Sequence, residues 1–188
     1  MKKNFGKSEL KNEEPISTLL YYISYKITKL TNINPNYITT ARLFLMLILY
    51  YLLYYGGRIM PAILLLICYF LDHLDGEMAR QNNRVTIFGD YYDHIVDQLY
   101  MLPLFYLLYL KFKYHRNLKI IIFVFIALMI TSTVLVGCQE LIFTKTNNKV
   151  KSQSLNIITK LCIVKDLHIL KFFGQGLLHV YLIFLILH

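Results

Sequence analysis

The stretch that decides the fold reads Asp72-His-Leu-Asp-Gly-Glu-Met-Ala-Arg80 and, eight residues later, Gly89-Asp-Tyr-Tyr-Asp-His-Ile-Val-Asp97. Long apolar runs flank it on both sides, yet it holds Asp72, Asp75, Asp93 and Asp97 in a chain with only 11 acidic residues. Carboxylates in or beside a membrane are costly, so a cluster of them indicates a functional site.

The composition is that of a polytopic membrane protein. The chain has 188 residues, 56% of them hydrophobic and arranged in blocks, which is typical of membrane spans rather than of a soluble core. This length suits one domain. We expect a polar cytosolic tail over residues 1–15, with no signal peptide, and a single membrane domain over 16–188.

The charge and the cysteines exclude two other classes. The net charge of +9 comes from basic residues interleaved with apolar runs, with no nucleic-acid motif, so we expect them to face anionic lipid and not nucleic acid. Cys68, Cys138 and Cys162 are odd in number and far apart, which predicts three buried small apolar residues and no disulfide framework.

The apolar periodicity predicts an all-α fold of five transmembrane helices, or six if a later segment also crosses. An amphipathic stretch over 16–30 predicts a helix lying in the membrane surface. The expected spans cover 38–55, 59–80, 86–110, 118–137 and 172–187. A second interfacial helix, or the sixth span, is expected over 155–170.

The distribution of Lys and Arg predicts the orientation. With a cytosolic N-terminus, 15 of the 20 basic residues lie on the cytosolic side and 5 on the other. Because cytoplasmic loops are enriched in Lys and Arg, we expect the four aspartates to face the cytosol.

The aspartate spacing predicts a metal site. Asp72 and Asp75 are three residues apart and Asp93 and Asp97 are four apart, so each pair shares one helix face. The short turn between their helices should make these antiparallel neighbours that bring all four carboxylates together. Four bare carboxylates would repel, and oxygen ligands without Cys or His suit Mg²⁺ or Mn²⁺.

Small and cationic residues beside the aspartates point to a phosphate ligand. Gly76 and Ala79 follow on the stripe of Asp72 and Asp75, and Gly89 precedes Asp93 by one turn, leaving a shallow floor. Arg80 offers a fork suited to phosphate, and Thr86 adds a hydroxyl. Together they predict a metal-bound diphosphate.

These residues resemble the signature of the CDP-alcohol phosphotransferase family, Asp-x-x-Asp-Gly-x-x-Ala-Arg, eight residues, then Gly-x-x-x-Asp-x-x-x-Asp. Every fixed position is met. Upstream, Pro35-Asn-Tyr-Ile-Thr-Thr-Ala-Arg42 resembles a Pro-Asn-x-x-Thr-x-x-Arg stretch that many members carry. The close resemblance covers about residues 35–97.

The resemblance implies an integral membrane enzyme that transfers a substituted phosphate from a CDP-alcohol to an acceptor hydroxyl and releases CMP. It implies two metal ions held by Asp72, Asp75 and Asp93, with Asp97 as general base and second-metal ligand. It also implies a homodimer. The residues implied to bind the CDP-alcohol are Asn36, Tyr37, Ile38, Thr39, Gly76, Ala79, Arg80, Thr86 and Gly89.

The branch of the family is left open by two conflicting resemblances. His94 directly after Asp93 resembles the choline and ethanolamine branch, which acts on diacylglycerol, whereas Arg42 and the small size resemble the branch that uses CDP-diacylglycerol. We favour CDP-diacylglycerol, with glycerol 3-phosphate, inositol, inositol phosphate or serine as the acceptor alcohol. A cation pathway or a non-catalytic membrane protein is the alternative from another class.

Several other polar residues have plainer interpretations. His73 and Glu77 lie off the stripe of Asp72 and are expected to face headgroups or a neighbour. His179 is expected to pack between helices. Gln139 and Glu140 are expected to cap the fourth span at its cytosolic end, with contact to an acceptor as the alternative.

Overall fold

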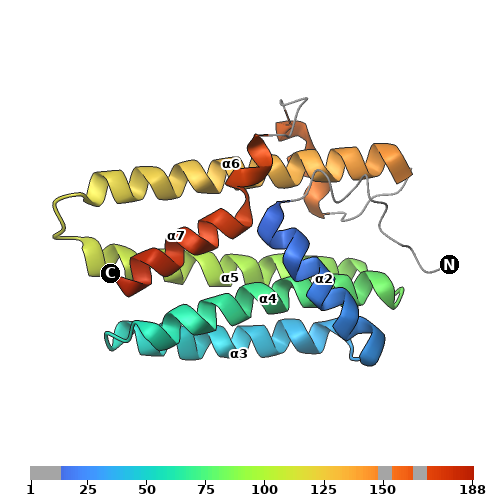
Figure 1. The fold of residues 1–188 in the computed structure, drawn as a ribbon, viewed down its shortest axis with the longest axis horizontal. Helices are drawn as coiled ribbons and strands as arrows, with labels where there is room; N and C mark the ends of the chain where they lie inside the picture. Colours follow the sequence, from blue (N-terminus) through green and yellow to red (C-terminus); the bar gives the residue numbers. More distant parts are fainter. Residues whose placement is uncertain (1–13, 148–153, 163–168) are drawn as a thin grey trace.

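The computed structural model describes residues 14–147, 154–162 and 169–188, whose regular secondary structure is entirely helical, with no strand among them. The elements are α2 (Pro15–Leu30), α3 (Pro35–Tyr54), α4 (Ile59–Gln81), α5 (Ile87–Phe112), α6 (Leu118–Asn147), the 3₁₀ turns η1 (Ser154–Leu161) and η2 (Leu170–Phe173), and α7 (Gln175–Leu187). Helices α3 to α6 run lengthwise beside one another, α7 slants between them, and α2 crosses one end (Figure 1). The predicted all-α class is confirmed.

Four of the described helices, α3 to α6, are long and apolar enough to cross a membrane. At about 1.5 Å per residue, the 20 residues of α3 match a hydrocarbon core of about 30 Å. The 13 residues of α7 extend only about 20 Å. The predicted fifth span is therefore a short apolar helix that begins three residues later than expected, after the 3₁₀ turn η2.

Helix α6 is longer than the sequence predicted. It ends at Asn147 instead of Gly137, because no proline follows to stop it and Leu141 and Ile142 continue the apolar pattern. Gln139 and Glu140 therefore lie inside the helix, so the prediction that they cap it is wrong. The interfacial helix expected over 155–170 is a 3₁₀ helix that ends at Leu161, and residues 163–168 lie outside the described part.

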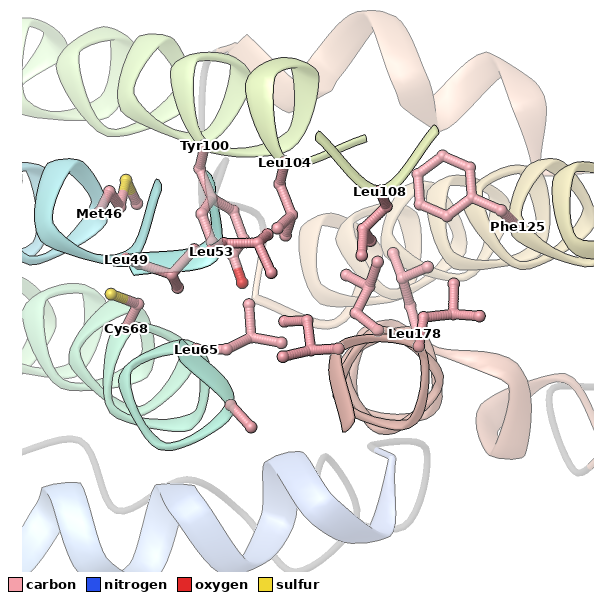
Figure 2. Close-up of a cluster of buried hydrophobic side chains, with 14 of the residues drawn as sticks. Met46, Leu49, Leu53, Leu65, Cys68, Tyr100, Leu104, Leu108, Phe125 and Leu178 are labelled. Carbon is pink, nitrogen blue, oxygen red and sulfur yellow. The ribbon is translucent and has the colours of Figure 1, made fainter. Parts of the chain in front are cut away.

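The core forms where five helices meet. Met46 and Leu49 of α3, Leu65 of α4, Leu104 of α5 and Leu182 of α7 are completely buried. Figure 2 shows side chains from α3, α4, α5 and α7 meeting there, with Phe125 of α6 at one side. The outer faces of the same helices are also apolar, as expected for helices surrounded by lipid.

Helix α2 has the character predicted for a surface helix. Its large apolar side chains Leu19, Ile23 and Leu30 point away from the protein, and Leu30 is 84% exposed. Its buried face carries Ser24 and Thr28, and it packs against α4. Small side chains on the protein face allow close packing, while the apolar face is free to enter lipid.

Both ends of α7 are held by charged side chains from distant parts of the chain. The buried Glu14 carboxylate accepts hydrogen bonds from the backbone N–H groups of Gly176 (2.8 Å) and Leu177 (3.0 Å). At the other end, the Lys111 ammonium donates to the carbonyls of Leu185 (3.1 Å) and Ile186 (2.7 Å). An anion at the N-terminus and a cation at the C-terminus complement the helix dipole.

We expect Glu14→Ala to lower stability by about 2 kcal/mol, because it leaves one buried and one partly buried N–H group unpaired at the start of α7. The measurement is thermal unfolding of the protein in detergent, with an expected fall in Tm of about 5 °C. Glu14→Gln is the matched control, since its amide oxygen still accepts one bond and the loss should be about half. Equal Tm values for the three proteins would contradict this role.

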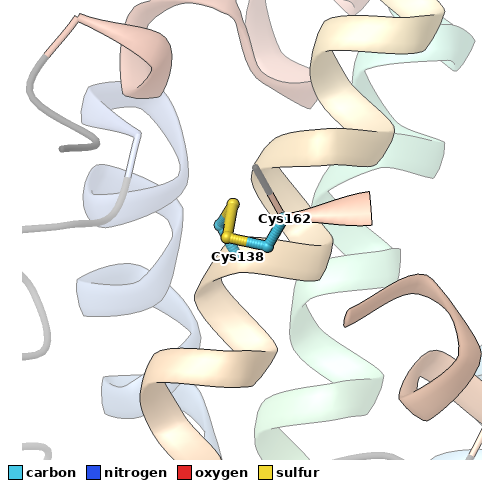
Figure 3. The surroundings of a disulfide bond; sticks show 2 residues. All are labelled: Cys138 and Cys162. Atoms are coloured by element: carbon cyan, nitrogen blue, oxygen red, sulfur yellow. A yellow bond between two sulfur atoms is a disulfide. The ribbon is translucent and has the colours of Figure 1, made fainter. Parts of the chain in front are cut away.

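The structure contradicts the predicted absence of disulfides. Cys138 of α6 and Cys162, just after η1, form a disulfide with Cα atoms 4.8 Å apart, and Cys68 is left as a buried free thiol (Figure 3). Spacing alone missed the pair because η1 folds back along α6. The two elements lie so close that a side chain at Gly137 would clash with Ile158.

Candidate functional site

A cavity of about 440 Å³ opens at the end of the bundle where α3 and α5 begin and α4 ends. The four aspartates lie in its wall, together with residues from α2, α6, η1 and α7. The sequence analysis predicted this convergence from the spacing of the aspartates and the short turn between their helices. The cavity extends well beyond the aspartates, on a side that the sequence did not single out.

Three of the four carboxylates form a compact group. Asp72, Asp75 and Asp93 each offer one oxygen, and these oxygens lie within 4.8 Å of one another. Asp75 is 3% exposed, whereas Asp72 and Asp93 open toward the cavity. Asp97 lies beside this group without being part of it.

Arg42 of α3 joins the carboxylates of the two other helices. Its Nη1 donates to Asp72 on α4, and its Nη2 donates to Asp93 on α5 at 2.6 Å and lies 3.0 Å from Asp97 Oδ1. Helix α3 packs against both α4 and α5, which places the guanidinium between them. The sequence analysis assigned Arg42 no role at the aspartates and explained their convergence by the short turn that should make α4 and α5 neighbours. That explanation is wrong: both helices pack against α3, and they make little direct contact with each other.

Asp75 has its own partner on α3. The hydroxyl of Thr39, one turn before Arg42, donates to Asp75 Oδ2 at 2.7 Å, and both groups are buried. One stripe of α3 therefore contacts all four aspartates. This explains in physical terms why Thr39 and Arg42 stand three residues apart at the start of the first span.

Arg80 is fixed by a residue that the sequence interpretation set aside. Its Nε and Nη2 donate to Glu77 Oε2 at 3.3 and 3.1 Å, and Gln81 donates to Oε1 at 2.7 Å. Glu77 is 1% exposed, so of the two expectations for it, headgroups or a neighbour, the structure supports the neighbour. A Cβ at Gly76 would lie 3.1 Å from Arg80 Nη1, so this glycine leaves room for the guanidinium.

The start of α5 forms the mouth of the cavity. Thr86 is the N-cap of α5 and accepts from the backbone N–H of Gly89 at 3.0 Å. A Cβ at Gly89 would lie 3.2 Å from Asn36 Oδ1, so glycine allows the ends of α3 and α5 to approach closely. The N-terminus of a helix favours anions, which suits a phosphate near Thr86.

Seven of the nine residues predicted to contact a nucleotide line the cavity, and two do not. Tyr37 is 71% exposed outside it, and Ile38 packs against Leu74 and Met78. The seven in the wall are Asn36, Thr39, Gly76, Ala79, Arg80, Thr86 and Gly89.

The far side of the cavity carries residues to which the sequence analysis gave no role in the site, although its prediction that His179 packs between helices is confirmed. The His179 ring stacks on Tyr69 with centroids 4.0 Å apart and faces Tyr100 at 5.8 Å. Its Nδ1 lies 2.7 Å from the Gln175 carbonyl, so Nδ1 carries the proton and Nε2 can accept a hydrogen bond. The sequence spacing could have indicated these two tyrosines. Tyr69 lies three residues before Asp72 and Tyr100 lies three residues after Asp97, so each shares a helix face with an aspartate and lies one turn deeper in the bundle.

The wall of the cavity fits a hard divalent cation. Three carboxylate oxygens within 4.8 Å, with no sulfur and no imidazole among them, are the donor set that Mg²⁺ or Mn²⁺ prefers. Asp72, Asp75 and Asp93 would hold such an ion. Arg80 and the α5 N-terminus lie in the same wall, where they suit the phosphates of a ligand.

Comparisons with known proteins agree with this chemistry. The family model described as CDP-alcohol phosphatidyltransferase matches residues 32–187. An archaetidylinositol phosphate synthase from Pyrococcus horikoshii is 36% identical over 67 residues, 36% of each chain. CDP-diacylglycerol–glycerol-3-phosphate 3-phosphatidyltransferases from Rickettsia typhi and Rickettsia prowazekii are each 37% identical over 68 residues, 35% of this chain and 38% of theirs.

The matched stretch thus spans little more than a third of these curated relatives. No solved structure shows significant similarity. The family model, by contrast, covers the described helices α3 to α7 and both halves of the aspartate motif. The chain therefore belongs to the CDP-alcohol phosphatidyltransferase family.

Proposed function

We propose that this protein is a metal-dependent phosphatidyltransferase. It transfers the phosphatidyl group of CDP-diacylglycerol to the hydroxyl of a small acceptor alcohol and releases CMP, a step of phospholipid synthesis. The observation that carries the proposal is the group of Asp72, Asp75 and Asp93 oxygens within 4.8 Å, in one wall with Arg80 and the start of α5.

In this proposal, different residues of the chain bind the donor and activate the acceptor. Arg80, Thr86 and Gly89 bind the cytidine diphosphate, and Asp97 takes the proton of the acceptor hydroxyl. The acceptor oxygen then bonds to the phosphorus that carries the diacylglycerol, and the bond from that phosphorus to CMP breaks. Asp72, Asp75 and Asp93 would hold one divalent ion and Asp97 a second, and such ions would supply charge stabilisation for the leaving CMP.

The position of Asp97 supports its proposed role as the base. Its Oδ1 faces Arg42, which fixes the carboxylate and leaves Oδ2 for the acceptor proton. Behind it, the stack of Tyr69, His179 and Tyr100 offers hydroxyl and imidazole groups on the acceptor side of the cavity. Such uncharged hydrogen-bonding groups suit an acceptor alcohol that is bound through its hydroxyl groups.

The donor is tested with the purified protein in detergent and two labelled substrates. We expect CMP release and a labelled phospholipid from CDP-diacylglycerol with Mg²⁺, and none from CDP-choline plus diacylglycerol. The reverse result would assign the protein to the choline and ethanolamine branch, which His94 in the cavity wall favours. No CMP from any donor would leave a cation pathway or a non-catalytic role. The same assay, run with each candidate acceptor, identifies the alcohol.

We further propose an integral membrane protein whose cavity faces the cytosol. The bias of basic residues supports this orientation, whereas a disulfide at the same end is typical of oxidising compartments. An Ile33→Cys variant tests it, because residue 33 is exposed in the loop before α3 and the remaining free thiol, Cys68, is buried.

We expect a membrane-impermeant maleimide to label Ile33→Cys only in inside-out vesicles. The wild-type protein is the control and should remain unlabelled in both preparations. Labelling in right-side-out vesicles would place the cavity on the opposite face. The homodimer implied by the family stays a prediction, to be tested by cross-linking in the membrane.

A further inference from the structure

Arg42 is a buried cation in the middle of the aspartates. Its side chain is 2% exposed, and its guanidinium contacts Asp72, Asp93 and Asp97. A buried arginine is costly unless its donors are paired. Here the carboxylates of α4 and α5 pair Nη1 and Nη2, while the buried Nε has no hydrogen-bond partner among the described residues. In return the guanidinium cancels one of the four negative charges.

The carboxylates held by Arg42 overlap with the proposed metal ligands. Asp72 and Asp93 belong to the three-oxygen group and are also the two residues that accept hydrogen bonds from Nη1 and Nη2. Asp75, the third member, is held by neutral Thr39 instead. A divalent ion that binds this group would therefore sit beside a positive guanidinium, and the two would repel.

We propose that Arg42 is a positioning residue with two effects, an inference that rests on the proposed metal site. It holds the carboxylates of α4 and α5 together before a metal ion arrives. It also competes with that ion for Asp72 and Asp93, so the ion binds less tightly than to three free carboxylates. A purely structural arginine would show the opposite sign, since its loss would disorder the ligands and weaken metal binding.

The test measures Mn²⁺ binding to the purified protein in detergent, without donor, from the electron paramagnetic resonance signal of free Mn²⁺. We expect Arg42→Gln to bind Mn²⁺ about tenfold more tightly than the wild type, because the competing charge is gone. Arg42→Lys keeps the charge but cannot bridge two carboxylates, and should bind about threefold more tightly. Arg84→Gln is the charge control: Arg84 lines the same cavity and contacts the Asn32 carbonyl.

The two effects also predict a stability signature. Without metal the Arg42 variants should have a lower Tm than the wild type, and saturating Mg²⁺ should raise their Tm by more than it raises that of the wild type. If Arg42→Gln does not fold, the Mn²⁺ affinity and the Tm of Arg42→Lys test the inference on their own.

The outcomes separate this inference from the proposed function. Unchanged or weaker Mn²⁺ binding in the Arg42 variants, beside a wild type that binds, overturns the competition. A wild type that binds no Mn²⁺ overturns the metal site itself. An Arg84→Gln protein that gains as much affinity as Arg42→Gln would show that the effect is only one of net charge, and would also overturn the assignment to Arg42.

Discussion

Asp97→Asn is expected to lower the rate of CMP release by about a thousandfold, since a positioned general base contributes about 10²–10⁴ in rate. The substitution keeps the shape of the side chain, and its amide oxygen can still accept from Arg42, 3.0 Å from Oδ1 in the wild type. Donor affinity should therefore change little. The measurements are CMP release under saturating donor and binding of labelled CDP-diacylglycerol.

A rate near that of the wild type would refute the role of Asp97 as base. A loss of donor binding equal to the loss of rate would instead make Asp97 a binding residue. The first Mn²⁺ ion, proposed for Asp72, Asp75 and Asp93, provides the control, because this group does not include Asp97 and should keep its ion even when the second ion proposed for Asp97 is lost.

Asp75→Asn should abolish turnover by a different route. Asp75 is the most buried of the three clustered carboxylates, and losing its charge should weaken Mn²⁺ binding at least about tenfold. Its amide can still accept from Thr39, so the fold should be retained. The measurements are Mn²⁺ affinity and CMP release, with high Mg²⁺ expected to recover part of the rate.

Thr39→Val is the matched comparison for Asp75→Asn. It removes the hydroxyl that donates to Asp75 at 2.7 Å but leaves every carboxylate in place. We expect a loss of Mn²⁺ affinity of about tenfold, which is typical when a group that supports a metal ligand is removed. Normal Mn²⁺ affinity and normal turnover in Asp75→Asn would contradict the metal site.

The sequence predicted the parts of the fold that depend on local pattern. The boundaries of α3, α4 and α5 lie within three residues of the predicted spans, because apolar runs and the Gly56-Gly57 turn mark them clearly. Convergence of the aspartates was also predictable, since spacings of three and four place side chains on one helix face.

Contacts between elements that are distant in the chain could not be predicted from the sequence. Arg42 reaches Asp72 and Asp93 because α3 packs against both α4 and α5, and nothing in the local pattern states this. The Cys138–Cys162 disulfide follows from η1 folding back on α6.

The burial of the charged residues Glu14 and Glu77 was not predicted, for the same reason. Glu14 lay in what was predicted as a polar tail, yet its carboxylate binds the start of α7, 162 residues away. Glu77 was expected to lie off the aspartate stripe and to face headgroups or a neighbour, and the local pattern did not say that its partners are Arg80 and Gln81. A charged residue in a helix can only be assigned to a surface once its neighbours are known.

The most direct measurement of the central claim is CMP release from CDP-diacylglycerol by the purified wild-type protein, with Mg²⁺ and with a chelator. Asp75→Asn serves as the matched protein that keeps the fold and lacks one clustered charge. We predict that the wild type releases CMP with Mg²⁺, releases none with the chelator, and recovers when Mg²⁺ or Mn²⁺ is returned. We predict no release from Asp75→Asn at ordinary Mg²⁺ concentration. Equal release with the chelator, or no release under any condition, would contradict it.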